Sequence, residues 1–244
     1  MPIGILVNTA AIILGGLLGA LLGNKMSDSY KEKLNMIFGL SAMGMGIASI
    51  VLMENMPAVI FSLILGTSVG CLIHLEERIT QGAGLMQKAI SKVLPQGKTL
   101  LSQEEYNATL VTIIVLFCAS GTGIYGSIVS GMTGDHSLLL AKSILDLFTA
   151  MIFACSLGLV VSAVALPQVV IFLLMFFMAG IIFPLTTPAM INDFKACGGF
   201  LMVATGFRIL KTKMFPTADM IPAMILVMPL SHLWSTYILP LVAK

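Results

Sequence analysis

Residues 34–53 read LNMIFGLSAMGMGIASIVLM, and residues 194–213 read FKACGGFLMVATGFRILKTK. Each copy is followed by an apolar segment that contains a Pro-Ala pair. Many secondary transporters contain a repeat that is inserted twice in opposite senses, with a site near the bilayer midplane. The two stretches therefore predict inverted-topology repeats. At a constant offset of 160 residues, the matched positions are Gly39 with Gly199, Gly46 with Gly206, and Ile50 with Leu210.

The composition is that of a membrane protein. Hydrophobic residues make up 58% of the 244 residues and charged residues only 10%, whereas soluble domains carry about 25% charged residues. The 13 basic and 11 acidic residues nearly balance, so we expect no nucleic-acid partner.

The apolar runs predict an all-α, polytopic membrane protein with about eight transmembrane spans, because a membrane helix needs about 20 apolar residues. Outer-membrane strands would instead alternate apolar and polar residues over about 10 positions. The first run lacks a positively charged leader and is read as a retained span. The predicted spans are residues 3–22, 34–53, 56–75, 108–130, 137–160, 166–183, 194–211 and 218–240.

Basic residues alternate between the predicted loops. Since basic loops stay on the cytoplasmic side, the pattern predicts a multi-pass protein of the bacterial plasma (inner) membrane with both termini periplasmic. The first three spans then run opposite to the last three. The basic residues follow the first span (Lys25, Lys31, Lys33), the third (Arg78, Lys88, Lys92, Lys98) and the seventh (Arg208, Lys211, Lys213).

These patterns predict a single transmembrane domain over residues 1–244. In its soluble stretch, GLMQKAISKVL (84–94) suits either an amphipathic helix on the membrane surface or a solvated linker helix. The parts of the domain are a first repeat (1–75), a cytoplasmic loop (76–107), a central glycine-rich polar hairpin (108–165) and an inverted second repeat (166–244).

Polar residues and glycines gather in CASGTGIYGSIVSGMTGD (118–135). A glycine costs a helix about 1 kcal/mol relative to alanine, so we predict a broken span with a break near residues 120–123. Backbone groups exposed at such a break could bind an ion; the alternative is close helix packing. The candidate ligands are Ser120, Thr122, Gly123 and Ser127.

Lys142 and Asp146 complete the candidate substrate- or ion-binding set. If the fifth span begins near Ser137, Asp146 lies about 14 Å into the membrane, close to its midplane. A charge there costs at least about 2.5–3.5 kcal/mol, so Asp146 should face the protein interior. It either carries an ion or proton in a polar cavity shared with Thr122 or Ser127, or forms a structural pair with Lys142.

No sequence motif indicates an enzyme, a cofactor or a metal. The three histidines and four cysteines form no cluster with ligand spacing, and the glycines at 121, 123 and 126 match a dinucleotide fingerprint without the strand that it requires. The segment from Pro184 to Lys195 reads as an outer loop that caps the seventh span; the alternative is that its hydroxyls and Asn192 line the mouth of a site. Asn8 and Thr9 serve either as contacts between helices or as ligands.

Several motifs are shared with one family. They are Gly15-Gly16-x-x-Gly19, Lys142-Ser143-x-x-Asp146, Cys197-Gly198-Gly199 with Gly206 and Ile209-Leu210, and Ile221-Pro222-Ala223. Through these, nearly the whole chain resembles the YqgA/YdfK-like bacterial inner-membrane proteins, which carry a domain of unknown function. The resemblance implies a polytopic plasma-membrane protein and no particular substrate. The sequence departs from the family at Pro167-Gln168, where Gln-Gly is expected.

Two functions are therefore open. The first is a small secondary transporter or ion-conducting protein for a small molecule or ion. The alternative is a non-transporting membrane scaffold or regulator, in which polar and glycine residues only pack helices. Beyond the lipid bilayer, the glycines of the first two spans predict a second copy of the chain as partner, because they allow close backbone approach. They are Gly15, Gly16, Gly19, Gly23, Gly39, Gly44 and Gly46.

Overall fold

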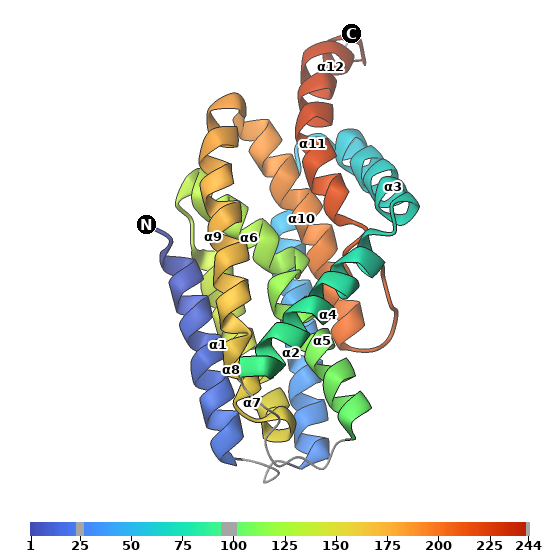
Figure 1. The fold of residues 1–244 in the computed structure, drawn as a ribbon. Coiled ribbons are helices and arrows are strands. Elements are labelled where there is room, and N and C mark those ends of the chain that lie inside the picture. The colour runs from blue at the N-terminus through green and yellow to red at the C-terminus, as the bar shows by residue number, and fades with distance from the viewer. Residues whose placement is uncertain (23–26, 94–101, 243–244) are drawn as a thin grey trace. The chain divides into compact units, whose positions relative to one another are not determined.

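The computed structural model describes residues 1–22, 27–93 and 102–242, and within these ranges every regular element is a helix (Figure 1). The predicted all-α class is therefore confirmed. Three residues used above, Gly23, Lys25 and Lys98, lie outside the described residues, as does the 94–101 segment of the predicted cytoplasmic loop.

The helices follow one another with short connections. In chain order they are α1 (Ile3–Leu22), α2 (Asp28–Ile50), α3 (Met56–Leu72), α4 (Leu75–Val93), α5 (Gln103–Cys118), α6 (Gly121–Thr133), α7 (Ser137–Leu157), α8 (Val160–Ala163), α9 (Ala165–Ile182), a 3₁₀ turn (Phe183–Leu185), α10 (Pro188–Ile209), α11 (Ile221–Leu233), a π-helical turn (Trp234–Ile238) and α12 (Leu239–Val242).

Six helical segments of the described chain are long and apolar enough to cross a membrane, against the eight spans predicted. A seventh is counted if α3 and α4, which meet at a 56° bend, form one broken span. The remaining predicted span corresponds to α10, whose first turns carry Asn192, Asp193 and Lys195 and are less apolar. The six are Ile3–Leu22, Glu32–Ile50, Gln103–Thr133, Ser137–Leu157, Val160–Leu185 and Ile221–Leu241.

The start of α10 corrects the predicted outer loop between Pro184 and Lys195. The Thr187 side chain accepts a hydrogen bond from the Met190 backbone N–H (3.3 Å), and Pro188 occupies the first helical position. A hydroxyl cap followed by proline is a strong helix start. Asp193 and Lys195 are consequently helical residues.

The described chain clusters into two compact units that interleave in sequence. The first unit comprises Met1–Met36 and Arg78–Gly180, and the second comprises Ile37–Glu77 and Ile181–Lys244. Each unit buries its own polar centre, and each is described below by itself.

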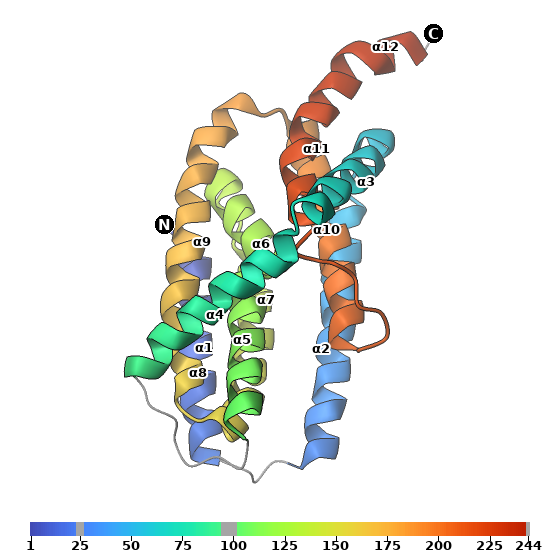
Figure 2. The ribbon, with the colours of Figure 1, turned by 45° about the vertical axis from the view of Figure 1, so that its right-hand side comes forward.

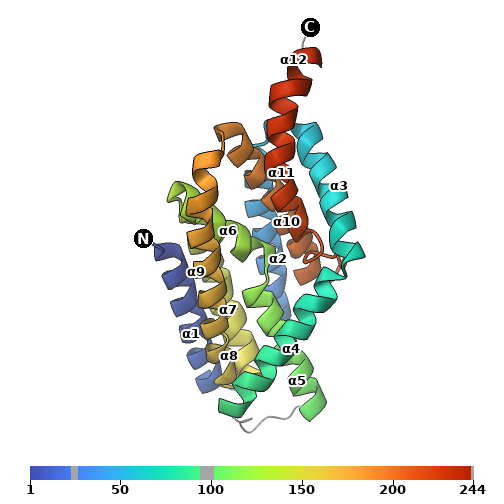
Figure 3. The ribbon, with the colours of Figure 1, turned by 45° about the horizontal axis from the view of Figure 1, so that its top comes forward.

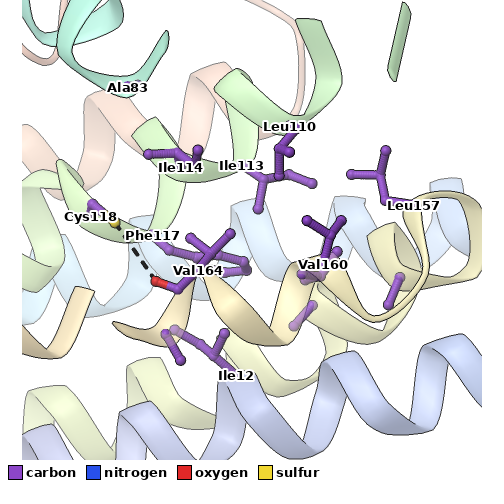
Figure 4. Packing of buried hydrophobic residues seen from close by; sticks show 14 of the residues in the cluster. Ile12, Ala83, Leu110, Ile113, Ile114, Phe117, Cys118, Leu157, Val160 and Val164 are labelled. Carbon is purple, nitrogen blue, oxygen red and sulfur yellow. Dashed lines mark hydrogen bonds between the residues drawn. The ribbon is translucent and has the colours of Figure 1, made fainter. Parts of the chain in front are cut away.

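In the first unit, α1 lies directly against α7. A Cβ atom on Gly15 would be 2.2 Å from the Leu147 carbonyl oxygen, and one on Gly19 would be 2.1 Å from that of Met151. Only glycine permits this approach, which brings Asn8 of α1 against α7. The unit's core lies around Phe117 (Figure 4).

Helix α4 runs obliquely past α5 (Figure 2). The Gln87 side chain donates to the Asn107 side chain across the two helices (3.0 Å). Ala83, Met86 and Ile90 pack against the core of the first unit, so protein covers much of the apolar face of this helix.

In the second unit, α2 and α10 cross at glycines. Helix α11 runs beside α10 and α3 (Figure 3). A Cβ on Gly46 would be 2.6 Å from the Gly199 carbonyl oxygen, and the reverse distance is also 2.6 Å. Gly39 meets Gly206 in the same way. These glycines pack within the chain, and the predicted second copy of the chain stays a prediction.

Candidate functional site

The candidate site is centred on Asp146 of α7. Lys142 stands one helical turn earlier, and its Nζ donates to Asp146 Oδ2. The residues are only 4% and 6% exposed, so this ion pair is buried. The Nζ also lies 6.0 Å from the centroid of the Phe117 ring, a distance at which the ring face attracts a cation.

One amide side chain bonds to this pair, and a second amide supports the first. Asn8 of α1 donates from Nδ2 to Asp146 Oδ2 (2.8 Å), and Gln168 of α9 donates from Nε2 to Asn8 Oδ1 (2.9 Å). Thr9 lies within donating distance of Gln168 Oε1 (3.1 Å) and of the Ile5 carbonyl oxygen (2.8 Å). Asn8 and Gln168 are fully buried.

The direction of these hydrogen bonds is set by Asp146. An ionised carboxylate only accepts, so the NH₂ group of Asn8 faces it. The Asn8 carbonyl must then face the NH₂ group of Gln168, whose own carbonyl is left to accept from Thr9. The chain of bonds from Asp146 through Asn8 to Gln168 is therefore consistent and joins three helices around one charge pair, while the single Thr9 hydrogen is shared between Gln168 and the Ile5 carbonyl.

The residues at the predicted helix break form a separate group. The break is present, since α5 ends at Cys118 and α6 begins at Gly121. Ser120 caps α6 by accepting from the Gly123 backbone N–H (3.1 Å), and Ser127 donates to the Gly123 carbonyl oxygen (2.7 Å).

Close packing also occupies this break. A Cβ on Gly123 would be 2.1 Å from the Phe172 ring, and Thr122 and Ser127 are buried. No hydrogen bond among the described residues joins Thr122 or Ser127 to Asp146, so a cavity shared by these residues stays a prediction.

The second unit buries another carboxylate, that of Asp193 on α10, which is fully inaccessible. Its Oδ1 accepts from the backbone N–H groups of Glu54 (2.8 Å) and Asn55 (2.9 Å). Its Oδ2 accepts from Asn55 Nδ2 (2.9 Å) and from the Ser231 hydroxyl (2.6 Å). These four donors lie at the N-terminus of α3 and on α11, and the helix dipole of α3 adds to the stabilisation of the anion.

Sequence reasoning missed this second centre and the role of Gln168. The sequence did hold a signal for the second centre. Asn8 and Asp146 are 138 residues apart, and Asn55 and Asp193 repeat the same amide–carboxylate pair at the same separation of 138 residues. Asn55 also stands directly before Met56-Pro57, a pattern typical of a helix start. Among the described residues, no group of three or more His, Cys, Asp and Glu side chains could hold a metal ion.

Comparison with known proteins now places the chain in a family. The sequence model of a family described as protein of unknown function, DUF554, matches residues 3–232. The chain belongs to the DUF554 family. The resemblance inferred from the sequence is thereby confirmed.

Two relatives of this DUF554 chain cover nearly its whole length. The uncharacterized protein YqgA of Escherichia coli (strain K12) is 44% identical over 237 residues, which is 97% of this chain and 99% of YqgA. The uncharacterized membrane protein YdfK of Bacillus subtilis (strain 168) is 27% identical over 227 residues, covering 91% and 93% of the two chains. No solved structure matches.

Proposed function

We propose that this protein is a small secondary transporter or ion-conducting protein of the bacterial inner membrane. Asp146 is the group that carries the ion or proton, and Lys142 is its partner when the site is empty. The observation that carries the proposal is the buried Lys142–Asp146 pair on α7, a helix long and apolar enough to cross a membrane.

Energetics argue for a role beyond folding. A buried ion pair is often no more stable than a hydrophobic pair of similar volume, because removing both charges from water is costly. Ionisable residues within membrane spans accordingly tend to lie on substrate or ion paths. Here Asn8 also donates to the carboxylate and is itself held by Gln168, so the site keeps its shape when Lys142 releases the carboxylate.

The mechanism requires an exchange of partners. An arriving cation or proton takes the place of the Lys142 ammonium on Asp146, and the pair reforms after release. The broken helix at Ser120, Thr122, Gly123 and Ser127 is proposed to line the path, since irregular backbone within a membrane is tolerated where it borders a cavity or is buried in protein.

The proposed inverted repeats would provide alternating access. In support, the glycines related by the 160-residue offset meet crosswise, Gly39 with Gly206 and Gly46 with Gly199. A two-fold axis perpendicular to two antiparallel helices produces such crosswise contacts, because it exchanges each residue with its equivalent on the other helix. The proposed orientation, with both termini periplasmic, follows from the basic loops.

The second candidate function, a non-transporting scaffold, is favoured by one observation. Asp146 accepts from Lys142 and Asn8, and Asn8 accepts from Gln168. Each of these side chains is thus bonded within one network, as expected of a network that only fixes helices. In that case the network would order α1, α7 and α9, and no charge would leave it.

Flux through proteoliposomes separates the two functions. We expect wild-type protein to move protons or monovalent cations under an imposed membrane potential, and Asp146→Asn to abolish the flux while the protein remains folded. The matched control is Glu104→Gln, which changes an exposed carboxylate at the start of α5. Normal flux in a stable Asp146→Asn variant would exclude Asp146 as carrier, and a wild-type protein without flux would favour the scaffold.

A further inference from the structure

The second unit contains an apolar cavity of about 180 Å³ that is partly open to its surroundings. It is lined only by apolar side chains, from α3, from α10 and from the segment after α10, among them Leu63, Phe200, Phe207 and Phe215. An apolar cavity of about 150 Å³ can stay dry and take up a benzene-sized guest. The chemistry of this lining fits hydrocarbon and offers nothing to a polar ligand.

The segment after α10 folds back over the end of that helix. The rings of Phe207 and Phe215 lie 5.6 Å apart, and Arg208 Nη1 donates to the Phe215 carbonyl oxygen (2.7 Å). The chain between these two cavity residues carries Lys211 and Lys213, and both lysines are exposed. Two cations therefore stand on the loop that borders the cavity.

Lys211 occupies a backbone position that suits another residue type. Its φ is +55°, in the left-handed region where helices usually end in glycine or asparagine. A lysine there is unfavourable for the backbone. The helix dipole of α10 attracts a cation at this end, but the exposed Lys213 two residues later gains little from that dipole.

We infer that this place binds an anionic phospholipid, with part of an acyl chain in the cavity and the phosphate on Lys211 and Lys213. The argument combines charge complementarity with the apolar lining. Basic pockets beside membrane helices bind acidic lipid headgroups, and here hydrocarbon and phosphate sites adjoin on a single loop. Arg208 is not proposed as a ligand, because it is bonded to Glu76, Phe215 and Thr217.

The test measures lipid binding by native mass spectrometry on the purified full-length protein. Phosphatidylglycerol is compared with phosphatidylcholine of the same chains. The variant is Lys211→Gly with Lys213→Ala, and we expect its affinity for phosphatidylglycerol to fall roughly 30-fold, since each surface lysine contributes several-fold. Thermal stability in phosphatidylcholine should not fall, because glycine suits the positive φ at position 211.

The matched control is Lys88→Ala with Lys92→Ala, which removes two exposed charges from α4. It should keep the wild-type affinity. An equal loss in both double variants would show diffuse attraction to acidic membranes and would overturn the site.

Two further measurements test the cavity and the ligand. Ala204 lines the cavity, and Ala204→Leu should weaken phosphatidylglycerol binding although both lysines remain. Soluble glycerol phosphate should bind at least tenfold more weakly than the lipid. Unchanged lipid binding in Ala204→Leu, or glycerol phosphate binding as tightly as lipid, would overturn the proposal.

Discussion

The two buried carboxylates are held in different ways. Asp146 in the first unit is paired with a cation on its own helix and with an amide from α1. Asp193 in the second unit has no cation within ion-pair distance among the described residues, and it accepts four hydrogen bonds instead. The first carboxylate is neutralised by Lys142, and the second is solvated by fixed donors.

The difference bears on which centre can exchange a partner. Lys142 has a flexible side chain, and its departure from Asp146 would leave the backbone of α7 intact. The donors to Asp193 include the backbone N–H groups of Glu54 and Asn55, so releasing this carboxylate would undo the start of α3. We therefore assign the proposed transport role to Asp146 and a structural role to Asp193.

The largest effect is expected from Lys142→Met. Removing one member of a buried ion pair costs about 3–5 kcal/mol, because the other charge stays buried without compensation. The double variant Lys142→Met with Asp146→Leu should recover most of this loss. Reversible unfolding in mixed micelles measures both free energies, and a double variant as unstable as the single one would refute the pairing as the reason.

The next largest effect concerns the packing that presents Asn8 to Asp146. Gly15→Ala should lower the free energy of unfolding by about 3 kcal/mol, at the upper end of the usual cost of overpacking a core, because the new methyl group would meet the Leu147 carbonyl. Gly44→Ala is the control, since no atom lies within 4 Å of its position. It should be neutral or slightly stabilising. A tolerated Gly15→Ala would mean that α1 is not held tightly on α7.

Asp193→Asn should cost about 2 kcal/mol, since hydrogen bonds to a charged group contribute about 1.5–3 kcal/mol. The loss from Lys142→Met is expected to be recovered by a second substitution at its charged partner. Asp193 has no cation within ion-pair distance among the described residues, so no such second substitution exists for Asp193→Asn. The control is Asp135→Asn, at an exposed turn where asparagine serves as well as aspartate. Equal stability of both variants would show that the charge on Asp193 contributes nothing.

The smallest effect is expected at the neutral members of the two centres. Ser231→Ala should cost about 1.5 kcal/mol, at the lower end for a hydrogen bond to a charged group, because its hydroxyl donates to the Asp193 carboxylate. Gln168→Leu should cost about 1 kcal/mol, because Asn8 Oδ1 loses its donor. A Ser231→Ala loss larger than that of Asp193→Asn would reverse the proposed ranking within the second centre.

Local features were predictable from the sequence. The break between α5 and α6 follows from Ser120 and the glycines after it, because a cap and weak helix formers act on their own neighbourhood. The pairing of Lys142 with Asp146 follows from helical spacing alone. The start of α10 at Pro188 could have been read from Thr187-Pro188, but the polar residues after it favoured a loop.

Partners that are distant in sequence were not predictable in this way. Gln168 meets Asn8 only because α9 lies against α1, and Asp193 meets Asn55 only because α10 lies against the start of α3. On α4, an apolar helical face could equally have packed on lipid or on protein. The structure packs Ala83, Met86 and Ile90 of this face against the core of the first unit.

The sequence by itself determined the membrane class, the all-α fold class and the spacing of Lys142 and Asp146 on one helix, since composition, run length and spacing act within a few turns of one helix. Tertiary structure decided that Asp146 has a cation and Asp193 only hydrogen-bond donors. The physical reason is that a buried carboxylate must be stabilised by whatever its neighbours offer. Those neighbours are set by which helices pack together, and glycines such as Gly15 and Gly19 fix that packing only once both helices are in place.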